Sequence, residues 1–130
     1  MKKKSKCSSE SNVALGKEAE ERAYQYLSAQ EGMEVIARNY RTPRGEIDLI
    51  CYDKTEKSVI FIEVKSGSGA NFLLCQEAIH AKKKAKIAKV AGEFLENLNR
   101  DYGYVRFDAL FIERERPYRI EHVRDIIMLA

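Results

Sequence analysis

The chain has 130 residues, of which 33% are charged and 45% are hydrophobic, and its formal net charge is +3. This length and balance predict one compact soluble domain with a single core. No apolar run approaches the roughly 20 residues that a membrane helix requires. The basic N-terminus is not followed by an apolar segment, so we expect neither a membrane partner nor a secretory signal.

The cysteines and the N-terminal residues indicate where the protein works and where its domain begins. Cys7, Cys51 and Cys75 do not have the spacing of metal ligands. Their odd number and the lack of an export signal favour reduced thiols, which predicts a cytoplasmic location. Residues 1–12 are polar and basic, and we expect a disordered tail followed by a single domain over residues 13–130.

The first predicted element is a helix over residues 13–30, which Gly32 follows as a stop signal. Four residues at helical spacing define its buried stripe: Ala19, Ala23, Tyr24 and Leu27. Glu20 falls within this stripe, whereas Glu18 and Glu21 point to solvent. A carboxylate on a buried stripe requires a partner, so Glu20 is the first candidate for a functional residue.

The following pattern predicts a sheet. Three strands are expected at residues 33–41, 45–53 and 58–65. A long helix over about 76–98 and a strand over 104–113 come next, and a short strand within 116–123 would lie at an edge because of Pro117. The order α-β-β-β-α-β then predicts an α/β fold, in which a parallel crossover builds a mixed β-sheet flanked by helices.

Charged residues converge on the hairpin of the second and third strands. Its four-residue link pairs Asp53 with Ser58 in an antiparallel register. That register places two further pairs opposite each other, namely Asp48 with Glu63 and Glu46 with Lys65. Because side chains alternate along a strand, we expect these four groups on one face of the sheet, at the end away from its apolar part.

The second helix has an apolar stripe and a lysine-rich face. The stripe consists of Ile87, Val90, Ala91, Phe94 and Leu98. Lys82, Lys86 and Lys89 lie on the opposite face, and Lys83 and His80 project with the stripe near its N-terminal end. The lysine face is either a solvated surface or a contact surface for phosphates, and in the second case we expect Lys82, Lys83, Lys86 and Arg44 to bind nucleic acid.

Carboxylates that converge in this way repel one another, by about 4 kcal/mol for two unit charges at 4 Å and an effective dielectric of 20. Either one carboxylate holds a proton or a cation lies between them. Mg²⁺ prefers hard oxygen ligands, which fits Asp48 and Glu63, with Glu20 in support. Lys65 would stabilise charge that develops on a phosphate, and Glu46 would hold Lys65 in place.

The spacing of Asp48 and the tripeptide Glu63-Val64-Lys65 resembles the signature of PD-(D/E)XK nucleases. Longer segments resemble, in order, the YraN-like family of small bacterial proteins over roughly residues 14–126: ALGKEAEERAYQYL, ARNYRTPRGEIDLI, VIFIEVKS, the lysine-rich helix and VRFDALFI. The resemblance implies a restriction-endonuclease-like core, similar to that of archaeal Holliday junction resolvases. It also implies a divalent metal, Mg²⁺ or Mn²⁺, and a nucleic-acid substrate.

The resemblance assigns roles to individual residues. It matches Glu20 to the acidic residue of the first helix, Asp48 to the acidic strand residue, Glu63 and Lys65 to the ExK pair, and Lys83 to the lysine of the second helix. Two departures concern Ala19, where the family often has glycine, and Ser66-Gly67, where a basic residue is frequent. The second departure removes a possible phosphate contact.

Three functions are open at this point. The leading hypothesis is a metal-dependent endonuclease that acts on DNA, including branched DNA. The second is a nucleic-acid-binding protein of the same fold that does not cut, and the third is a small protein-interaction domain without metal affinity. Cutting a junction would require two sites and hence a homodimer. A structural alternative makes Asp48, Glu63 and Lys65 an ion-pair ladder, and Asp108 beside Arg106 is expected to belong to a structural network.

Overall fold

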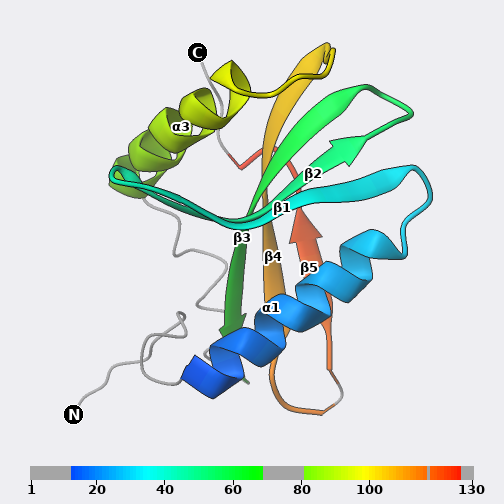
Figure 1. Cartoon of the computed structure of the whole chain (residues 1–130). Helices are drawn as coiled ribbons and strands as arrows, with labels where there is room; N and C mark the ends of the chain where they lie inside the picture. Colours follow the sequence, from blue (N-terminus) through cyan, green and yellow to red (C-terminus); the bar gives the residue numbers. More distant parts are fainter. Residues whose placement is uncertain (1–12, 69–80, 117, 127–130) are drawn as a thin grey trace.

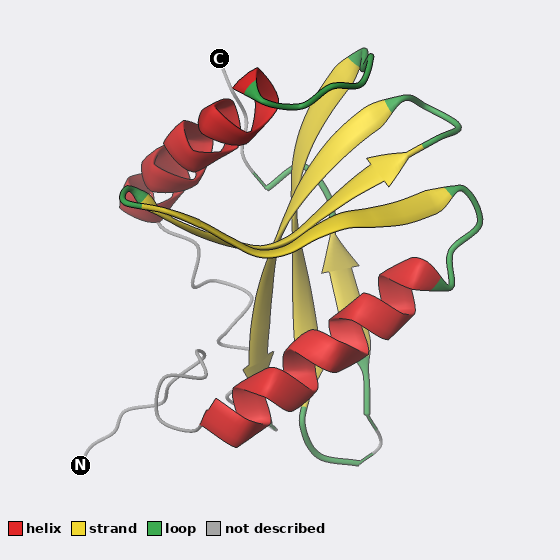
Figure 2. Cartoon of the chain, in the orientation of Figure 1, coloured by secondary structure: helices red, strands yellow, loops and turns green. Residues whose placement is uncertain are grey.

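The computed structural model describes residues 13–68, 81–116 and 118–126, and these ranges form two helices and five strands (Figures 1 and 2). The elements are α1 (Val13–Ser28), β1 (Met33–Thr42), β2 (Gly45–Asp53), β3 (Ser58–Gly67), α3 (Ala81–Glu96), β4 (Tyr104–Glu113) and β5 (Ile120–Val123). The predicted mixed α/β fold and its element order are confirmed. The expected tail, and the part of the long helix before residue 81, lie outside the described residues.

The five strands form one sheet in the order β1-β2-β3-β4-β5. β3 and β4 are parallel, whereas the other neighbours are antiparallel. The chain from β3 to β4 passes through α3, as the predicted parallel crossover requires, and β5 forms an edge strand as expected. α1 and α3 pack on opposite faces of the sheet (Figure 1).

Each face of the sheet has its own hydrophobic core. On the α1 side, Ala19, Ala23 and Leu27 pack against Leu49, Cys51, Ile60, Ile62, Leu110 and Ile112. On the α3 side, Ile87, Val90 and Ala91 pack against Ile47, Ile50, Tyr52, Val59, Phe61 and Phe107. The predicted helix stripes are therefore confirmed, except that Tyr24, Phe94 and Leu98 are only partly buried and Leu98 lies beyond the end of α3. Burial of one such aliphatic or aromatic side chain contributes about 1.5–3 kcal/mol.

Cys51 lies in the α1-side core and is fully buried. Burial raises the pKa of its thiol to about 12, so the thiol stays protonated and unreactive near neutral pH. Cys7 and Cys75 lie outside the described residues. Within the described segments, neither helix has the length and apolarity to cross a bilayer.

The hairpin of β1 and β2 crosses from one face of the sheet to the other. Arg38 contacts α1, where its guanidinium stacks on Tyr24, whereas the ring of Tyr40 lies 5.1 Å from that of Phe94 on α3. In β2, Leu49 joins the α1-side core and Ile47 joins the α3-side core. Residues two apart in a regular strand share a face, so both strands change face between these positions.

The end of this hairpin packs on α3, which fixes the direction of the crossing. A Cβ atom on Gly45 would lie 3.3 Å from Cγ2 of Val90, and glycine therefore allows a close approach. Arg44 forms an ion pair with Glu93 of α3. One part of the hairpin thus packs against α1 and its turn end packs against α3, with the crossing between the pairs Arg38↔Leu49 and Tyr40↔Ile47.

Candidate active site

Asp48 lies where the β2–β3 ladder stops. The predicted register is confirmed from Asp53↔Ser58 to Leu49↔Ile62. Beyond that point, Oδ2 of Asp48 accepts a hydrogen bond of 2.7 Å from the backbone N–H of Val64. A side-chain carboxylate thus takes the place of a backbone carbonyl as acceptor, which fixes Asp48 at the edge of β3.

Glu63 and Lys65 are adjacent on one face of β3. The Lys65 Nζ atom lies 3.4 Å from Oε2 of Glu63, and the two side chains are 10% and 11% exposed, respectively. Charged groups this deeply buried require compensation, and the pair provides part of it. The end of β3 therefore places a carboxylate and an ammonium side by side, next to the backbone that holds Asp48.

Glu20 approaches the same segment from α1. It is partly buried, and with Gly16, Ala19, Val64 and Ser66 it lines a small polar hollow. Val64, whose amide binds Asp48, is thus a shared neighbour of Glu20 and Asp48. Glu18 and Glu21 on the same helix are exposed, as the sequence predicted.

The carboxylates of this region interact electrostatically. Burial, and next the charge of Glu63, raise the pKa of Asp48 to about 8, against the opposing effect of the Val64 hydrogen bond. Glu20 and Glu46 raise the pKa of Asp48 further. Burial and the charge of Glu46 also raise the pKa of Glu20, while Arg38, Arg41 and a hydrogen bond from Asn39 lower it. Three acidic side chains, Glu63, Glu20 and Glu46, therefore lie within electrostatic reach of Asp48.

Glu46 has a different setting from the predicted one. The β1–β2 register pairs it with Arg41, and Oε1 of Glu46 lies 3.2 Å from Nε of Arg41. The expectation that Glu46 shares a face with Asp48 and lies opposite Lys65 assumed strict alternation along β2. That alternation is wrong at residues 47–49, where β2 changes face. Support of Lys65 by Glu46 stays a prediction.

The donor chemistry fits a divalent metal at Asp48 and Glu63. Within the described ranges, no group of three or more His, Cys, Asp or Glu side chains is arranged to hold a metal ion. Mg²⁺ commonly binds through one or two carboxylates and completes its shell with water and substrate phosphates. A carboxyl group whose pKa is raised to about 8 is also one that a cation would ionise. Glu20 as a third ligand stays a prediction.

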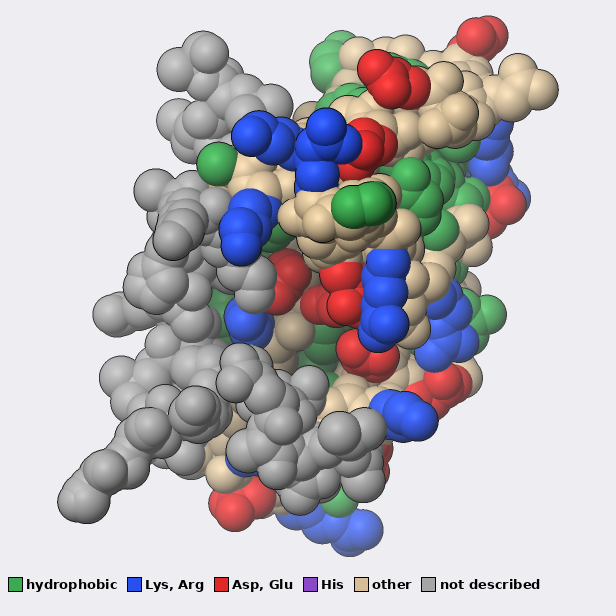
Figure 3. Space-filling view, turned by 60° about the vertical axis from the view of Figure 1, so that its left-hand side comes forward, with side chains coloured by type: hydrophobic (Ala, Val, Ile, Leu, Met, Phe, Trp, Pro, Cys, Tyr) green, Lys and Arg blue, Asp and Glu red, His purple; other side chains and the backbone are tan. Residues whose placement is uncertain are grey.

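Basic side chains are exposed on α3 and in the β1–β2 turn. On the face drawn in Figure 3, Asp and Glu side chains gather near the middle, and Lys and Arg side chains lie around them. Lys86 and Lys89 are exposed on α3, as predicted. Arg44 is 59% exposed in the β1–β2 turn, where it pairs with Glu93. The side chains of Lys82 and Lys83, and all of His80, lie outside the described part.

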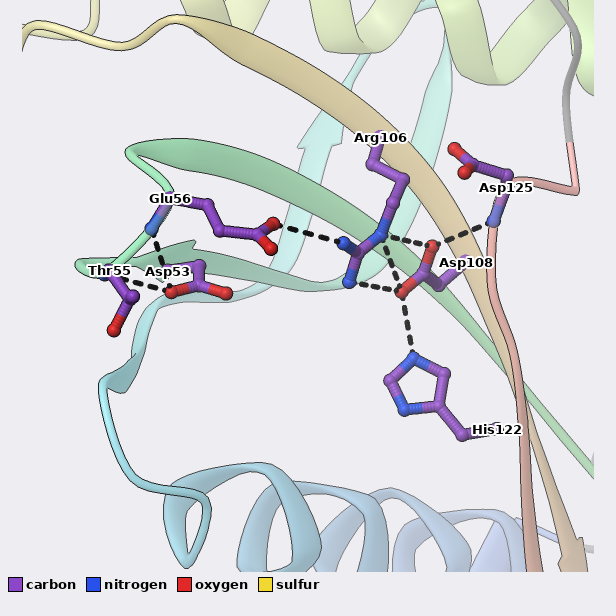
Figure 4. Close-up of polar contacts among 7 residues, drawn as sticks. All are labelled: Asp53, Thr55, Glu56, Arg106, Asp108, His122 and Asp125. Atoms are coloured by element: carbon purple, nitrogen blue, oxygen red, sulfur yellow. Dashed lines mark hydrogen bonds and ion pairs between the residues drawn. The ribbon is translucent and has the colours of Figure 1, made fainter.

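A second polar cluster surrounds Asp108, which is fully buried in β4 (Figure 4). Its carboxylate accepts hydrogen bonds of 3.0–3.2 Å from Arg106 and of 3.1 Å from the backbone N–H of Asp125. Nε2 of His122 lies 2.7 Å away. His122, Arg106 and the Asp125 amide hold the pKa of Asp108 below its usual value despite burial. The expected structural network is present, and its member His122 was missed.

The sequence pattern does not single out four residues that lie near the acidic site or this network: Arg38, Asn39, Arg41 and His122. Arg38 and Asn39 belong to the segment ARNYR, which marked the family resemblance but offered no chemical reason to single them out. His122 is brought to Asp108 only by the β4–β5 register, which pairs it with Leu110. A four-residue edge strand has too weak a pattern to predict that register.

We predict that Asp48 makes the stability of the metal-free protein depend on pH. An unfolded Asp ionises near pH 4, whereas the raised pKa of Asp48 keeps it protonated in the fold until about pH 8. The free energy of unfolding should therefore fall as pH rises from 4 to 8, by roughly 2–4 kcal/mol from this group. Urea unfolding of the wild type and of Asp48→Asn, measured in EDTA at several pH values, gives the contribution of Asp48 as the difference between the two pH dependences. If the unfolding free energy falls with pH equally steeply in both proteins, this pH dependence does not come from Asp48. Glu18→Gln, at an exposed site, is the control and should behave like the wild type.

We predict that Asp108→Ala destabilises the fold strongly. The substitution leaves Arg106 and the Asp125 amide without their buried acceptor, which costs about 3–5 kcal/mol of unfolding free energy. Glu56→Ala removes only an exposed partner 3.8 Å from Arg106, and should cost less than about 1 kcal/mol. Urea denaturation measures both, and a loss for Asp108→Ala as small as that for Glu56→Ala would show that the network is not structural.

Comparisons with known proteins agree with this sequence and fold. Residues 19–112 match the family described as "Uncharacterised protein family UPF0102". A UPF0102 protein of Rhodococcus opacus is 39% identical over 116 residues, which are 88% of this chain and 96% of that protein. A UPF0102 protein of Frankia casuarinae is 37% identical over 113 residues, with coverages of 85% and 93%.

The chain is also similar to a solved structure, that of Pyrococcus furiosus SfsA in complex with Ca²⁺. The two chains are 18% identical, the match covers 89% of this chain and 64% of the SfsA chain, and the TM-score is 0.31. A score this low supports no inference about fold or function. The family match and the relatives confirm the resemblance to the YraN-like family. Membership in the PD-(D/E)XK superfamily is consistent with this family. The chain belongs to the UPF0102 family.

Proposed function

We propose that the protein is a metal-dependent endonuclease that hydrolyses phosphodiester bonds in DNA, with branched DNA among its substrates. The observation that carries the proposal is the end of β3, where Glu63 and Lys65 lie side by side next to Asp48. The order of these three residues follows the PD-(D/E)XK signature. Membership in the UPF0102 family is consistent with that superfamily.

In this proposal, Asp48 and Glu63 hold Mg²⁺ or Mn²⁺, and Glu20 supports them. When bound, the ion would lower the pKa of a water and polarise the phosphodiester. Hydrolysis forms one P–O bond to water, breaks the opposite P–O bond to a sugar oxygen, and transfers a proton from the water to the products. Lys65 contributes a positive charge for the phosphate as negative charge builds up, and its ion pair with Glu63 keeps it in position.

The basic side chains around the acidic region would bind the rest of the nucleic acid. Lys86 on α3 and Arg44 in the β1–β2 turn are exposed, and Lys82 and Lys83 precede Lys86 on the same helix. Phosphate contacts of this kind supply affinity without sequence preference. Symmetric cutting of a four-way junction would further require a homodimer with two sites.

We predict that cleavage requires Asp48 and Glu63. Asp48→Asn and Glu63→Gln keep side-chain size but remove the ionised oxygens, so each should lower the cleavage rate at least about 100-fold. The assay uses labelled four-way junctions, flaps, duplexes and single strands of DNA, and matched RNA, with Mg²⁺ or Mn²⁺. Binding of the same DNA by both variants should be retained or tighter, because the basic surface is unchanged and each variant replaces one acidic side chain with a neutral amide.

Two outcomes would overturn the nuclease proposal. Cleavage by the wild-type protein that both variants retain would indicate a contaminating enzyme. A wild type that binds these nucleic acids but cuts none of them with either metal would favour the non-catalytic binding protein. Glu18→Gln, a charge loss on the exposed side of α1, is the matched control and should cleave like wild type.

We predict that Lys86 contacts a phosphate. Lys86→Gln should weaken DNA binding about equally for all sequences and reduce the slope of log K against log salt concentration by about 0.9. Lys54→Gln removes the same charge from the exposed β2–β3 turn, at the other end of the hairpin, and should leave the slope unchanged. Fluorescence anisotropy between 50 and 200 mM salt, a range in which such contacts have clear effects, measures both. An unchanged slope for Lys86→Gln would place the DNA elsewhere.

A further inference from the structure

We infer that an open hollow between α1 and the turn joining β4 to β5 binds one unpaired nucleotide of a DNA strand, with its base stacked on the ring of Tyr118. We call this place the Tyr118 hollow. Its geometry rests on contacts within the fold. The choice of DNA as its ligand rests on the proposed function, which supplies a nucleic-acid substrate.

The Tyr118 hollow has a mostly apolar lining and a volume of about 430 Å³. Two aromatic and two aliphatic side chains form most of its wall, namely Tyr26, Tyr118, Ile112 and Ile120. Polar groups of α1 lie among them, and they include Arg22 and Gln25. Apolar walls with a few polar groups are the usual form of a binding site for an organic ligand.

Tyr118 presents a flat aromatic surface in a fixed orientation. The guanidinium carbon of Arg22 lies 3.7 Å from the centroid of the Tyr118 ring, and Nε of Arg116 lies 3.5 Å from the Tyr118 hydroxyl oxygen. Arg22 is itself held by an ion pair of 3.1 Å with Glu18. Tyr118 nevertheless remains 43% exposed. Arg22 thus covers one face of the ring and Arg116 lies beside its hydroxyl, which leaves ring surface for a second planar group such as a base.

The charge beside the Tyr118 hollow favours an anionic ligand. Residues 114–119 contain three arginines against one glutamate: Arg114, Arg116, Arg119 and Glu115. Arg116 and Arg119 are exposed. The nearby glutamates of α1 are each engaged in an ion pair, Glu18 with Arg22 and Glu21 with Arg38. The β4–β5 turn is therefore a site to which phosphates are attracted.

A nucleotide combines the two properties that the Tyr118 hollow requires, because it joins a flat, largely apolar base to a phosphate. A base inside a duplex is covered on both faces by its neighbours and cannot stack on a side chain. Aromatic side chains accordingly bind bases of single strands, loops and ends. The ligand that fits is an unpaired nucleotide.

The Tyr118 hollow lies next to the candidate active site. Its residue Ile112 pairs with Ser66 of β3, and Ser66 lines the small polar hollow together with Glu20. Neighbouring strands are about 4.8 Å apart. The β4–β5 turn also lies at the same end of the sheet as the end of β3 (Figure 1). A DNA strand bound at the candidate site therefore passes close to Tyr118, and we expect the preferred substrates to carry unpaired nucleotides beside a duplex, as a flap does.

The base contact can be tested on the wild-type protein without metal. Single-stranded oligodeoxynucleotides that carry 5-iododeoxyuridine are bound in EDTA and irradiated, and the cross-linked peptides are identified by mass spectrometry. We expect a cross-link to Tyr118. Cross-links that map only to residues outside the Tyr118 hollow would overturn the inference, and this readout does not depend on the folding of any variant.

The energetic role of the ring is tested by fluorescence anisotropy in EDTA. Tyr118→Ala should weaken the binding of single-stranded DNA about 10-fold, because it removes the stacking surface, and should leave the binding of fully paired duplex unchanged. Tyr118→Phe keeps the ring and should bind like the wild type. Tyr104→Ala removes a tyrosine that is 69% exposed at the start of β4, and as the matched control it should bind single strands like the wild type.

The outcomes separate this inference from the proposed function. Equal losses of single-strand and duplex binding in Tyr118→Ala would indicate a general effect and overturn the base contact. A wild type that cuts DNA, with a Tyr118→Ala variant that binds and cuts flaps equally well, would overturn the inference and leave the nuclease standing. A wild type that cuts nothing, but forms the Tyr118 cross-link and loses single-strand affinity in Tyr118→Ala, would refute the nuclease and support the inference.

Discussion

The crossing of the β1–β2 hairpin at Asn39 and Asp48 is the constraint from which the rest of the candidate site follows. One end of the hairpin is fixed on α1 by Arg38 and Leu49, and the other on α3 by Tyr40, Ile47 and the close contact of Gly45 with Val90. Neither residue at the crossing belongs to a hydrophobic core. The fold therefore has a rung where polar side chains are acceptable, and there the β2–β3 ladder gives way to the Asp48 carboxylate. β1 is the long edge strand of the sheet. Its regular geometry is interrupted by the left-handed backbone conformation of Asn39 and by the register shift between Val35 and Ala37, which disfavours pairing with other chains.

Conventional hydrophobic burial holds this rung in place. The two cores on either face consist of aliphatic and aromatic side chains, and each anchors one part of the hairpin to a different helix. The polar contacts at the crossing are individually weak or exposed, such as the pairs of Arg38 with Glu21 and of Arg41 with Glu46. They select the geometry of the site, while the cores supply the free energy. If the proposed function holds, substitutions at the rung would for this reason change metal binding without unfolding the protein.

Most of the fold, but only part of the site, could be predicted from the sequence. Periodicity located both helix stripes and four strands, because burial on one face leaves a regular pattern. The short link at residues 54–57 fixed the β2–β3 register. Alternation then failed at residues 47–49, since strict period two cannot anticipate a strand that changes face. Glu20, Asp48, Glu63 and Lys65 were found because charge on an apolar element is conspicuous. Asn39 and His122 were not, because a polar residue in an exposed or edge segment gives no such signal.

The two aspartates in the polar clusters differ in a way that bears on function. Asp108 is fully buried, yet Arg106, His122 and a backbone amide satisfy its carboxylate and lower its pKa. Burial raises the pKa of Asp48, and the charges of other carboxylates, Glu63 first, raise this pKa further. A cluster whose own members neutralise its buried charge has a structural role and requires no ligand. A cluster that brings acids together from α1, β2 and β3 makes the metal-free protein less stable at neutral pH, and in the proposed function a bound cation would reverse that cost. This difference in electrostatic compensation is the physical reason to look for metal chemistry at Asp48 and not at Asp108.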